Sequence, residues 1–225
     1  MASAGLISKS FAVYAKDIRL EFRSRYALNT ILMFGITTLV IVSFAVGQSN
    51  LPTNLLAALY WVIMFFSAMA ALSQVFVREE EAGTALALKL TADPTAVYLG
   101  KFFFNLTIFG LLTVIITPLF FIVTDAPTSG VAPFVVVVVL GVAALCCATT
   151  LVGAIISKAA IKGALFAVLS FPILIFPLLM LVTASDRVLR GLGLGAASSE
   201  VQGLAAYAVV MFVLSLMLFK FVWRE

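Results

Sequence analysis

Residues 131–156 read VAPFVVVVVLGVAALCCATTLVGAII, and this stretch decides the fold. It contains no charged side chain, and about 20 apolar residues are enough to cross the hydrocarbon core of a bilayer as a helix. The run Val135–Val139 would favour a strand in water. In lipid, however, a helix satisfies its own backbone hydrogen bonds, and that requirement overrides β-propensity. The stretch is therefore predicted to be a transmembrane helix.

The composition of the whole chain agrees with that prediction. Of 225 residues, 64% are hydrophobic, 11% are charged and none is His, whereas a soluble domain carries about 25% charged residues. This balance excludes a soluble enzyme, a disordered tail and a nucleic-acid-binding domain, and it indicates a polytopic membrane protein. Without His, no catalytic or metal-ligating residue is predicted. The adjacent Cys146 and Cys147 are interpreted as small hydrophobic residues of a helix.

Five further apolar stretches accompany residues 131–156, and all are continuously apolar rather than alternating, which favours helices over barrel strands. The six transmembrane helices are predicted at about 27–46, 54–76, 98–124, 131–156, 164–183 and 203–222. With residues 1–26 as an amphipathic helix, they make one all-α membrane domain over residues 1–225. Pro172 and Pro177 are expected to kink the fifth span.

The positions of the basic residues predict the orientation. With six spans, both termini lie on one side, and that side carries twelve of the fourteen Lys and Arg residues. Only Arg187 and Arg190 lie opposite. Because loops rich in Lys and Arg stay inside the cell, both termini are predicted to be cytoplasmic. Lys101 is placed at the cytoplasmic edge of its span, where it is expected to snorkel to the surface. No span contains Asp or Glu, which argues against an ion-coupled carrier.

Residues 5–25 are too polar to cross the membrane. Their apolar side chains recur at helical spacing: Ile7, Phe11, Tyr14, Ile18 and Phe22. This pattern predicts an amphipathic helix lying along the cytoplasmic interface, with its apolar side among the acyl chains. Glu21 and Arg25 are spaced to pair one helical turn apart. The helix is interpreted either as a simple anchor or as a lever that connects a cytoplasmic partner to the first span.

The loop at 77–97 is the most informative one. It opens with a charged cluster, continues with a short apolar helix-like run over residues 85–90, and turns at Asp93-Pro94. Three neighbouring carboxylates on the basic side of the membrane need a reason. They either pair with the basic N-terminal helix, or they form a charged knob that docks, with the short helix, into a groove on a soluble partner. The two interpretations are compatible.

On the opposite side, residues 184–202 form the longest predicted loop. They contain Asp186, Arg187 and Arg190, followed by GLGLGAASSE. The pattern predicts a short surface helix and then a flexible link into the last span. There is no Walker A motif in the chain, so any ATP must be bound by another subunit.

Three motifs, taken in order, carry a family resemblance. KDIRLEFRSRYALNT lies at 16–30, VREEEAGT at 77–84 and DPTAVYLGKFFFN at 93–105. They resemble the membrane subunits of type-2 ABC exporters and, more closely, the heme exporter B (CcmB) family of the cytochrome c maturation system. The resemblance extends over essentially the whole chain.

The resemblance implies the type-2 ABC exporter permease fold. The N-terminal helix would be its elbow helix, whose predicted site residues are Lys16, Asp17, Arg19, Glu21, Arg23 and Arg25. Residues 78–90 would contain the coupling helix that meets the ATPase, and the predicted coupling residues are Arg78, Glu79, Glu80, Glu81, Gly83 and Thr84. The segment 184–202 would be an external re-entrant piece.

The resemblance also implies partners in a bacterial inner membrane. Two copies of the chain would pair with two ATPase subunits of the heme exporter A type, which would hold ATP and Mg²⁺. The other implied partners are a heme-handling membrane protein with a tryptophan-rich motif (C type), a small single-span subunit (D type), a heme chaperone and membrane lipid. Trp61 and Trp223 are isolated and the chain has no His, so the axial ligands of any heme cargo are expected in other subunits.

The predicted function is that of a non-catalytic permease subunit, which uses a partner ATPase for heme export or for release of a heme-loaded chaperone. Two alternatives are kept. One is a permease of the same class that exports another amphiphile, such as a lipid, a glycan or a drug, because the uncharged interior suits any apolar cargo. The other is a scaffold that holds partners in the membrane without transport.

Overall fold

The computed structural model describes residues 5–46, 51–72, 74–81, 83–157 and 162–224, and most of them are helical. Two predicted features lie outside the described residues: Lys158, one of the basic residues of the predicted cytoplasmic side, and residues 47–50 of the first predicted external loop. The helices are α1 (Leu6–Ser24), α2 (Tyr26–Val46), α3 (Thr53–Leu72), α4 (Gln74–Glu81), α5 (Ala85–Thr91), α6 (Pro94–Thr124), η1 (Thr128–Gly130), α7 (Val131–Ile156), α8 (Lys162–Leu189), α9 (Gly193–Ala196) and α10 (Ser198–Arg224).

Among the described residues, five helices are long and apolar enough to cross a membrane, namely α2, α6, α7, α8 and α10. They confirm five of the six predicted spans. The predicted span at 54–76 is divided: its apolar part is the shorter stretch Thr53–Met69 of α3, while Val75 and Phe76 belong to α4. The six-span count therefore stays a prediction.

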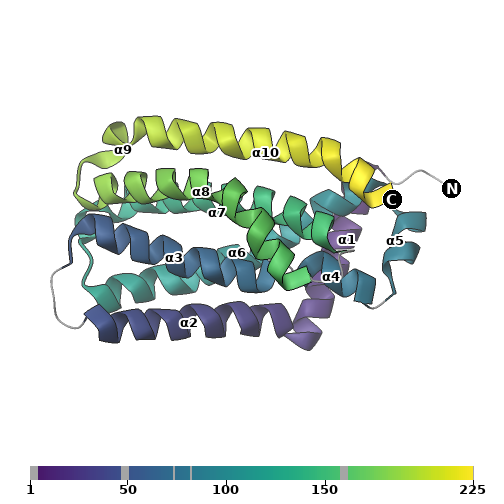
Figure 1. Ribbon diagram of the computed structural model, residues 1–225, viewed down its shortest axis with the longest axis horizontal. Helices are drawn as coiled ribbons and strands as arrows, with labels where there is room; N and C mark the ends of the chain where they lie inside the picture. The colour runs from purple at the N-terminus through teal and green to yellow at the C-terminus, as the bar shows by residue number, and fades with distance from the viewer. Residues whose placement is uncertain (1–4, 47–50, 73, 82, 158–161, 225) are drawn as a thin grey trace.

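The long helices run side by side as one bundle (Figure 1). The uncharged stretch 131–156 forms α7, which packs against α6, α8 and α10, while α2 packs against α3 and α6. At one end of the bundle lie α1, α4, α5 and the end of α10, and α9 lies at the other. The charged segments predicted to share one side of the membrane are thus gathered at one end of the molecule.

Close packing between helices depends on small residues at their crossings. A Cβ atom added to Gly141 of α7 would lie 2.3 Å from Cη2 of Trp61 on α3. The Trp61 indole is buried there and donates from Nε1 to Oγ of Ser185, at 2.8 Å. Gly141 therefore makes room for a large aromatic side chain that ties α3 to α8.

Helix α8 is longer than predicted. It continues past residue 183 to Leu189, because Asp186 and Arg190 pair one turn apart, with Arg190 Nη2 2.9 Å from Asp186 Oδ2, and so support another turn. The turn after it contains Gly191 at φ +79°, a left-handed conformation that glycine adopts without strain. The predicted short helix of this region is α9, but α10 begins already at Ser198, so the expected flexible link is much shorter than residues 184–202 suggested.

Both prolines of the fifth predicted span lie inside α8. Figure 1 shows α8 changing direction along its length, which agrees with the expected effect of Pro172 and Pro177.

Candidate functional site

The N-terminal helix α1 turns a polar side toward the protein. Its buried residues are Ser10, Val13, Asp17 and Glu21, whereas Ile7, Phe11 and Phe22 of the predicted apolar face are exposed. In a soluble protein the apolar face would point inward, so this arrangement favours contact of the outer face with lipid. The helix predicted at 5–25 is confirmed, and Figure 1 shows it crossing the end of the bundle.

Helix α1 lies very close to the start of α6. A Cβ atom added to Gly100 of α6 would be 2.7 Å from Cβ of Val13, so only glycine permits this approach. A second tie joins the beginnings of the two helices, where Nζ of Lys9 donates to Oδ2 of Asp93 at 2.8 Å. Helices α1 and α6 are thereby held as a pair.

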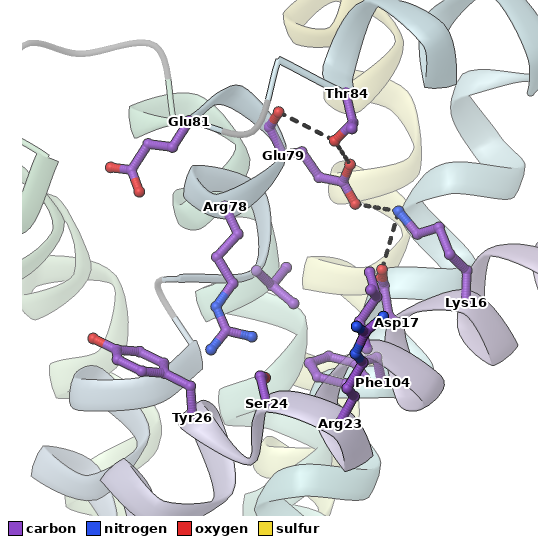
Figure 2. Close-up of a pocket in the computed structure, with 12 residues that line it drawn as sticks. Lys16, Asp17, Arg23, Ser24, Tyr26, Arg78, Glu79, Glu81, Thr84 and Phe104 are labelled. Carbon is purple, nitrogen blue, oxygen red and sulfur yellow. Dashed lines mark hydrogen bonds and ion pairs between the residues drawn. The ribbon is translucent and has the colours of Figure 1, made fainter.

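Four charged side chains meet where α1, α4 and α6 converge, and we call Lys16, Asp17, Glu79 and Lys101 the ion network. Lys101 Nζ lies 3.1 Å from Oδ2 of Asp17 and 3.0 Å from Oε1 of Glu79. It also donates to the carbonyl oxygen of Val75 at 3.1 Å. Lys16 pairs with the same two carboxylates from the outside, as Figure 2 shows. The network therefore binds three separate helices through alternating charges.

Lys101 is the residue that sequence reasoning missed. It was expected to snorkel to the surface, but it is 0% exposed and its ammonium faces inward. The prediction was wrong because snorkelling assumes that only water can satisfy the ammonium, whereas α1 and α4 bring two carboxylates to it. The signal that could have revealed this pairing is a lone lysine within an apolar helix, with acidic residues on two flanking amphipathic segments.

Glu79 is the centre of the network. Burial by itself would raise the pKa of Glu79, but the charge of Lys101 and hydrogen bonds from Lys16, Thr84 and Lys101 outweigh it and lower that pKa to about 2. The Thr84 hydroxyl donates to Oε2 of Glu79 at 2.6 Å. Burial would lower the pKa of Lys16, but Asp17 and Glu79 raise it overall. Both groups are held in their charged forms at neutral pH.

A second, partly buried ion pair lies beside the network. Nη1 of Arg78 is 3.0 Å from Oε2 of Glu21, and the backbone N–H of Leu28 donates to Oε1 of the same carboxylate at 2.9 Å. The Arg78 guanidinium also lies 4.6 Å from the centre of the Tyr26 ring. The predicted pairing of Glu21 with Arg25 is wrong, because Arg25 takes a left-handed conformation and ends α1, so Glu21 turns to α4 and α2 instead.

Between α1 and α4 lies a cleft of about 920 Å³, drawn in Figure 2. Its lining includes Arg23, Arg78 and Glu81, with Phe104 on α6. Of the predicted coupling residues, Glu79 is buried, Arg78 and Glu80 are half-buried, and Glu81, Gly83 and Thr84 lie at the surface.

The short helix predicted at residues 85–90 is confirmed as α5. It exposes two leucines one turn apart, Leu86 at 68% and Leu90 at 81%. Neither was among the predicted site residues, although their i,i+4 spacing was visible in the sequence. Because α5 projects from the end of the bundle (Figure 1), these side chains form an apolar surface beyond the ion network.

The predicted external residues lie at the opposite end and do not join the ion network. Asp186 accepts hydrogen bonds from the Thr53 hydroxyl and, at 3.0 Å, from Nε of Arg190. Nη1 of Arg187 donates to Oε2 of Glu200 at 2.9 Å. These contacts connect the start of α3, the end of α8 and the start of α10, so the three residues act as clamps between helices.

Over the described residues, no three Cys, Asp or Glu side chains come together in a way that could hold a metal ion. Cys146 and Cys147 are free and buried within α7. Ligation of heme by other subunits stays a prediction.

The ion network makes stability depend on pH in a predictable direction. The folded-state pKa of Glu79 lies below its ordinary value, so its stabilising effect is complete above about pH 5 and is lost as the pH falls toward 2. The thermal midpoint of the detergent-solubilised protein, followed by circular dichroism, should therefore drop over this range. The difference in free energy of unfolding between the parent and Glu79→Gln should be largest near pH 7, at about 3 kcal/mol, and should shrink toward pH 2. A difference that stays constant would contradict the assigned pairing.

A family model described as CcmB protein matches residues 8–222, which includes most of α1, the segment 78–90 and nearly all of the long helices. A search of curated proteins found no match.

Proposed function

The chain belongs to the CcmB family, and from this membership and the ion network we propose that it transmits the work of a partner ATPase into the membrane. The family makes it a multi-pass membrane component of a heme exporter in cytochrome c biogenesis, working in a complex with other Ccm proteins. The finer assignment, coupling to ATP hydrolysis, is our proposal, and the contacts between α1, α4 and α6 support it.

The observation that carries the proposal is the position of Glu79. Its carboxylate contacts Lys16 of α1 and Lys101 of α6, and α6 is one of the helices long enough to span the membrane. A displacement of α4 therefore acts directly on a transmembrane helix and on the N-terminal helix. Breaking these buried ion pairs is costly, so the three helices are expected to move together.

The surface that receives the ATPase is proposed to be α5 with the end of α4. The exposed Leu86 and Leu90 supply apolar anchors, and Glu80 and Glu81 supply charges beside them. A short amphipathic helix that lays two leucines into a groove on a partner is a common mode of recognition. Glu80, Glu81 and the two leucines would contact the ATPase, while Glu79 and Arg78 hold α4 to the rest of the protein.

The remaining parts of the proposal follow from the orientation. We place α1, α4 and α5 on the cytoplasmic side and count α3 as a span, which brings the number of spans to six. The protein is placed in a bacterial inner membrane, where two copies face two ATPase subunits of the heme exporter A type. ATP and Mg²⁺ are held by those subunits, and heme by the C-type subunit with its tryptophan-rich motif or by the heme chaperone. The D-type single-span subunit completes the complex. The output of the cycle is heme export or release of the loaded chaperone.

The docking surface can be tested by truncating its leucines. Leu86→Ala/Leu90→Ala should weaken co-purification of the partner ATPase by about tenfold or more, because withdrawing a leucine side chain from water contributes roughly 1.5–3 kcal/mol. The matched control is Leu6→Ala/Ile7→Ala, which removes two exposed apolar side chains of α1 and should leave the ATPase bound.

The same strains report on coupling. Glu79→Gln should retain the ATPase in the complex yet lower the yield of heme-bearing c-type cytochromes, whereas Leu86→Ala/Leu90→Ala should lower both. Normal cytochrome yield in a strain lacking the chain would reject the heme role and favour another amphiphile as cargo. Equal ATPase activity with and without the chain would favour the scaffold alternative.

A further inference from the structure

The outer face of α1 carries a groove whose two arginines, Arg19 and Arg23, have no part in the coupling proposal. It measures about 540 Å³ and is lined by Phe11, Ala12, Ala15 and Leu20 together with Lys16, Arg19 and Arg23. Three basic side chains thus border an apolar floor, and no acidic residue lines the groove. We propose that this groove binds the phosphate of an anionic phospholipid.

The charges in the groove support an anionic occupant. Arg19 and Arg23 are exposed, and within the described part of the chain neither makes an ion pair. Lys16, by contrast, is engaged with Asp17 and Glu79. The two arginines are therefore available to a ligand, and a planar guanidinium is well suited to bidentate contact with a phosphate.

An adjoining apolar groove supplies a place for an acyl chain. This groove measures about 310 Å³ and lies between α1 and α6, with Ile7, Leu99, Phe103 and Leu106 in its lining. Phe11 lines both grooves. Because α6 is one of the helices long enough to cross a membrane, the side chains from Leu99 to Leu106 lead from the end that carries α1 toward the bilayer.

The dimensions fit one lipid molecule. From Arg19 to Phe11 is eight residues, or about 12 Å of helix, and an acyl chain fills half of a hydrocarbon core about 30 Å thick. A headgroup at Arg19 and Arg23 can therefore place a chain beside Phe11 and along α6. A free phosphate would use only the basic half, and an acidic protein surface would not need the apolar groove.

The test is native mass spectrometry of the full-length protein in detergent, with dioleoylphosphatidylglycerol, dioleoylphosphatidylcholine and inorganic phosphate as probes. The anionic lipid should bind at least tenfold more tightly than the zwitterionic one. Arg19→Gln/Arg23→Gln should lower its affinity by roughly fivefold for each arginine removed, on the scale expected for interfacial basic residues. Lys220→Gln, which removes an exposed cation of α10, should leave it unchanged.

The two halves of the site are separated by a second variant. Leu106→Trp fills the apolar groove without changing charge, and it should weaken phosphatidylglycerol binding while the thermal midpoint stays near that of the parent. Equal binding of the two lipids, or unchanged binding in the double arginine variant, would overturn the proposal. Phosphate that binds as tightly as the lipid, with no effect of Leu106→Trp on either probe, would overturn it in favour of a free anion. These outcomes do not depend on whether an ATPase docks at α5.

Discussion

Lys101→Met is expected to lower the free energy of unfolding by about 3–5 kcal/mol, the range for removing one partner from a buried ion pair. The side chain is 0% exposed and its ammonium lies 3.1 Å from Asp17 and 3.0 Å from Glu79. Without it, Lys16 alone faces two carboxylates that have little access to water. Electrostatic repulsion and desolvation then act together against the folded state.

Two buried cysteines make the measurement direct. Cys146 and Cys147 are 0% and 3% exposed, so a thiol-reactive dye labels them only as the helices separate, and the thermal midpoint at neutral pH can be read from the labelling. Lys220→Met removes an exposed lysine from α10 and serves as the control. A midpoint for Lys101→Met equal to that of this control would contradict a stabilising role for the ion network.

The double variant Lys101→Met/Glu79→Gln separates pairing from simple loss of packing. It removes one positive and one negative charge and leaves Lys16 paired with Asp17, at 3.2 Å. Because the two residues are in contact, the double variant should be less destabilised than the sum of the single variants, by about 0.5–3 kcal/mol. Strict additivity would show that the two side chains act independently.

Gly141→Ala is expected to destabilise the bundle by roughly 1–3 kcal/mol, as overpacking of a filled core does. The added methyl group would lie 2.3 Å from Cη2 of Trp61 and 2.6 Å from Cδ2 of Leu181. The indole must then move and weaken its 2.8 Å hydrogen bond to Ser185. An unsatisfied buried indole N–H adds to the steric cost.

The chain offers a matched control for this substitution. Gly110 is also a helical glycine, in α6, and a Cβ atom built there meets nothing within 4 Å. Gly110→Ala should therefore be neutral or slightly stabilising, since Ala is the better helix residue. Trp61→Phe in the Gly141→Ala background should recover part of the loss, because the shorter ring removes the clashing atoms. Equal midpoints for Gly141→Ala and Gly110→Ala would contradict the packing described for Trp61.

The sequence predicted the elements of this protein more reliably than their ends. The long apolar runs predicted the spanning helices α2, α6, α7, α8 and α10, because any segment of that length without charge is driven into a helix by lipid. The ends of the helices depended on contacts that no local pattern contains. Asp186, read as a loop residue, extends α8 through its pairing with Arg190 and Thr53, and Val75 belongs to α4 rather than to the preceding span.

At the candidate site, too, the sequence indicated which segments are charged but not how their side chains pair. The sequence offered pairing of the acidic cluster with the N-terminal helix as one of two interpretations, and Glu79 makes that contact with Lys16. It could not show which carboxylates would turn inward, because α4 and α1 are 57 to 63 residues apart at these contacts. It also could not show that Leu86 and Leu90 remain exposed.

The sequence by itself determined a helical membrane protein with its charged segments on one side, since hydropathy and the placement of Lys and Arg act locally and additively. Only the tertiary structure decided whether Lys101 is buried or exposed. A lysine in an apolar helix either reaches water or finds carboxylates, and the choice depends on how closely α1 approaches α6 at Gly100 and where α4 delivers Glu79. Because of that three-helix geometry, a residue expected at the surface is a buried member of the ion network.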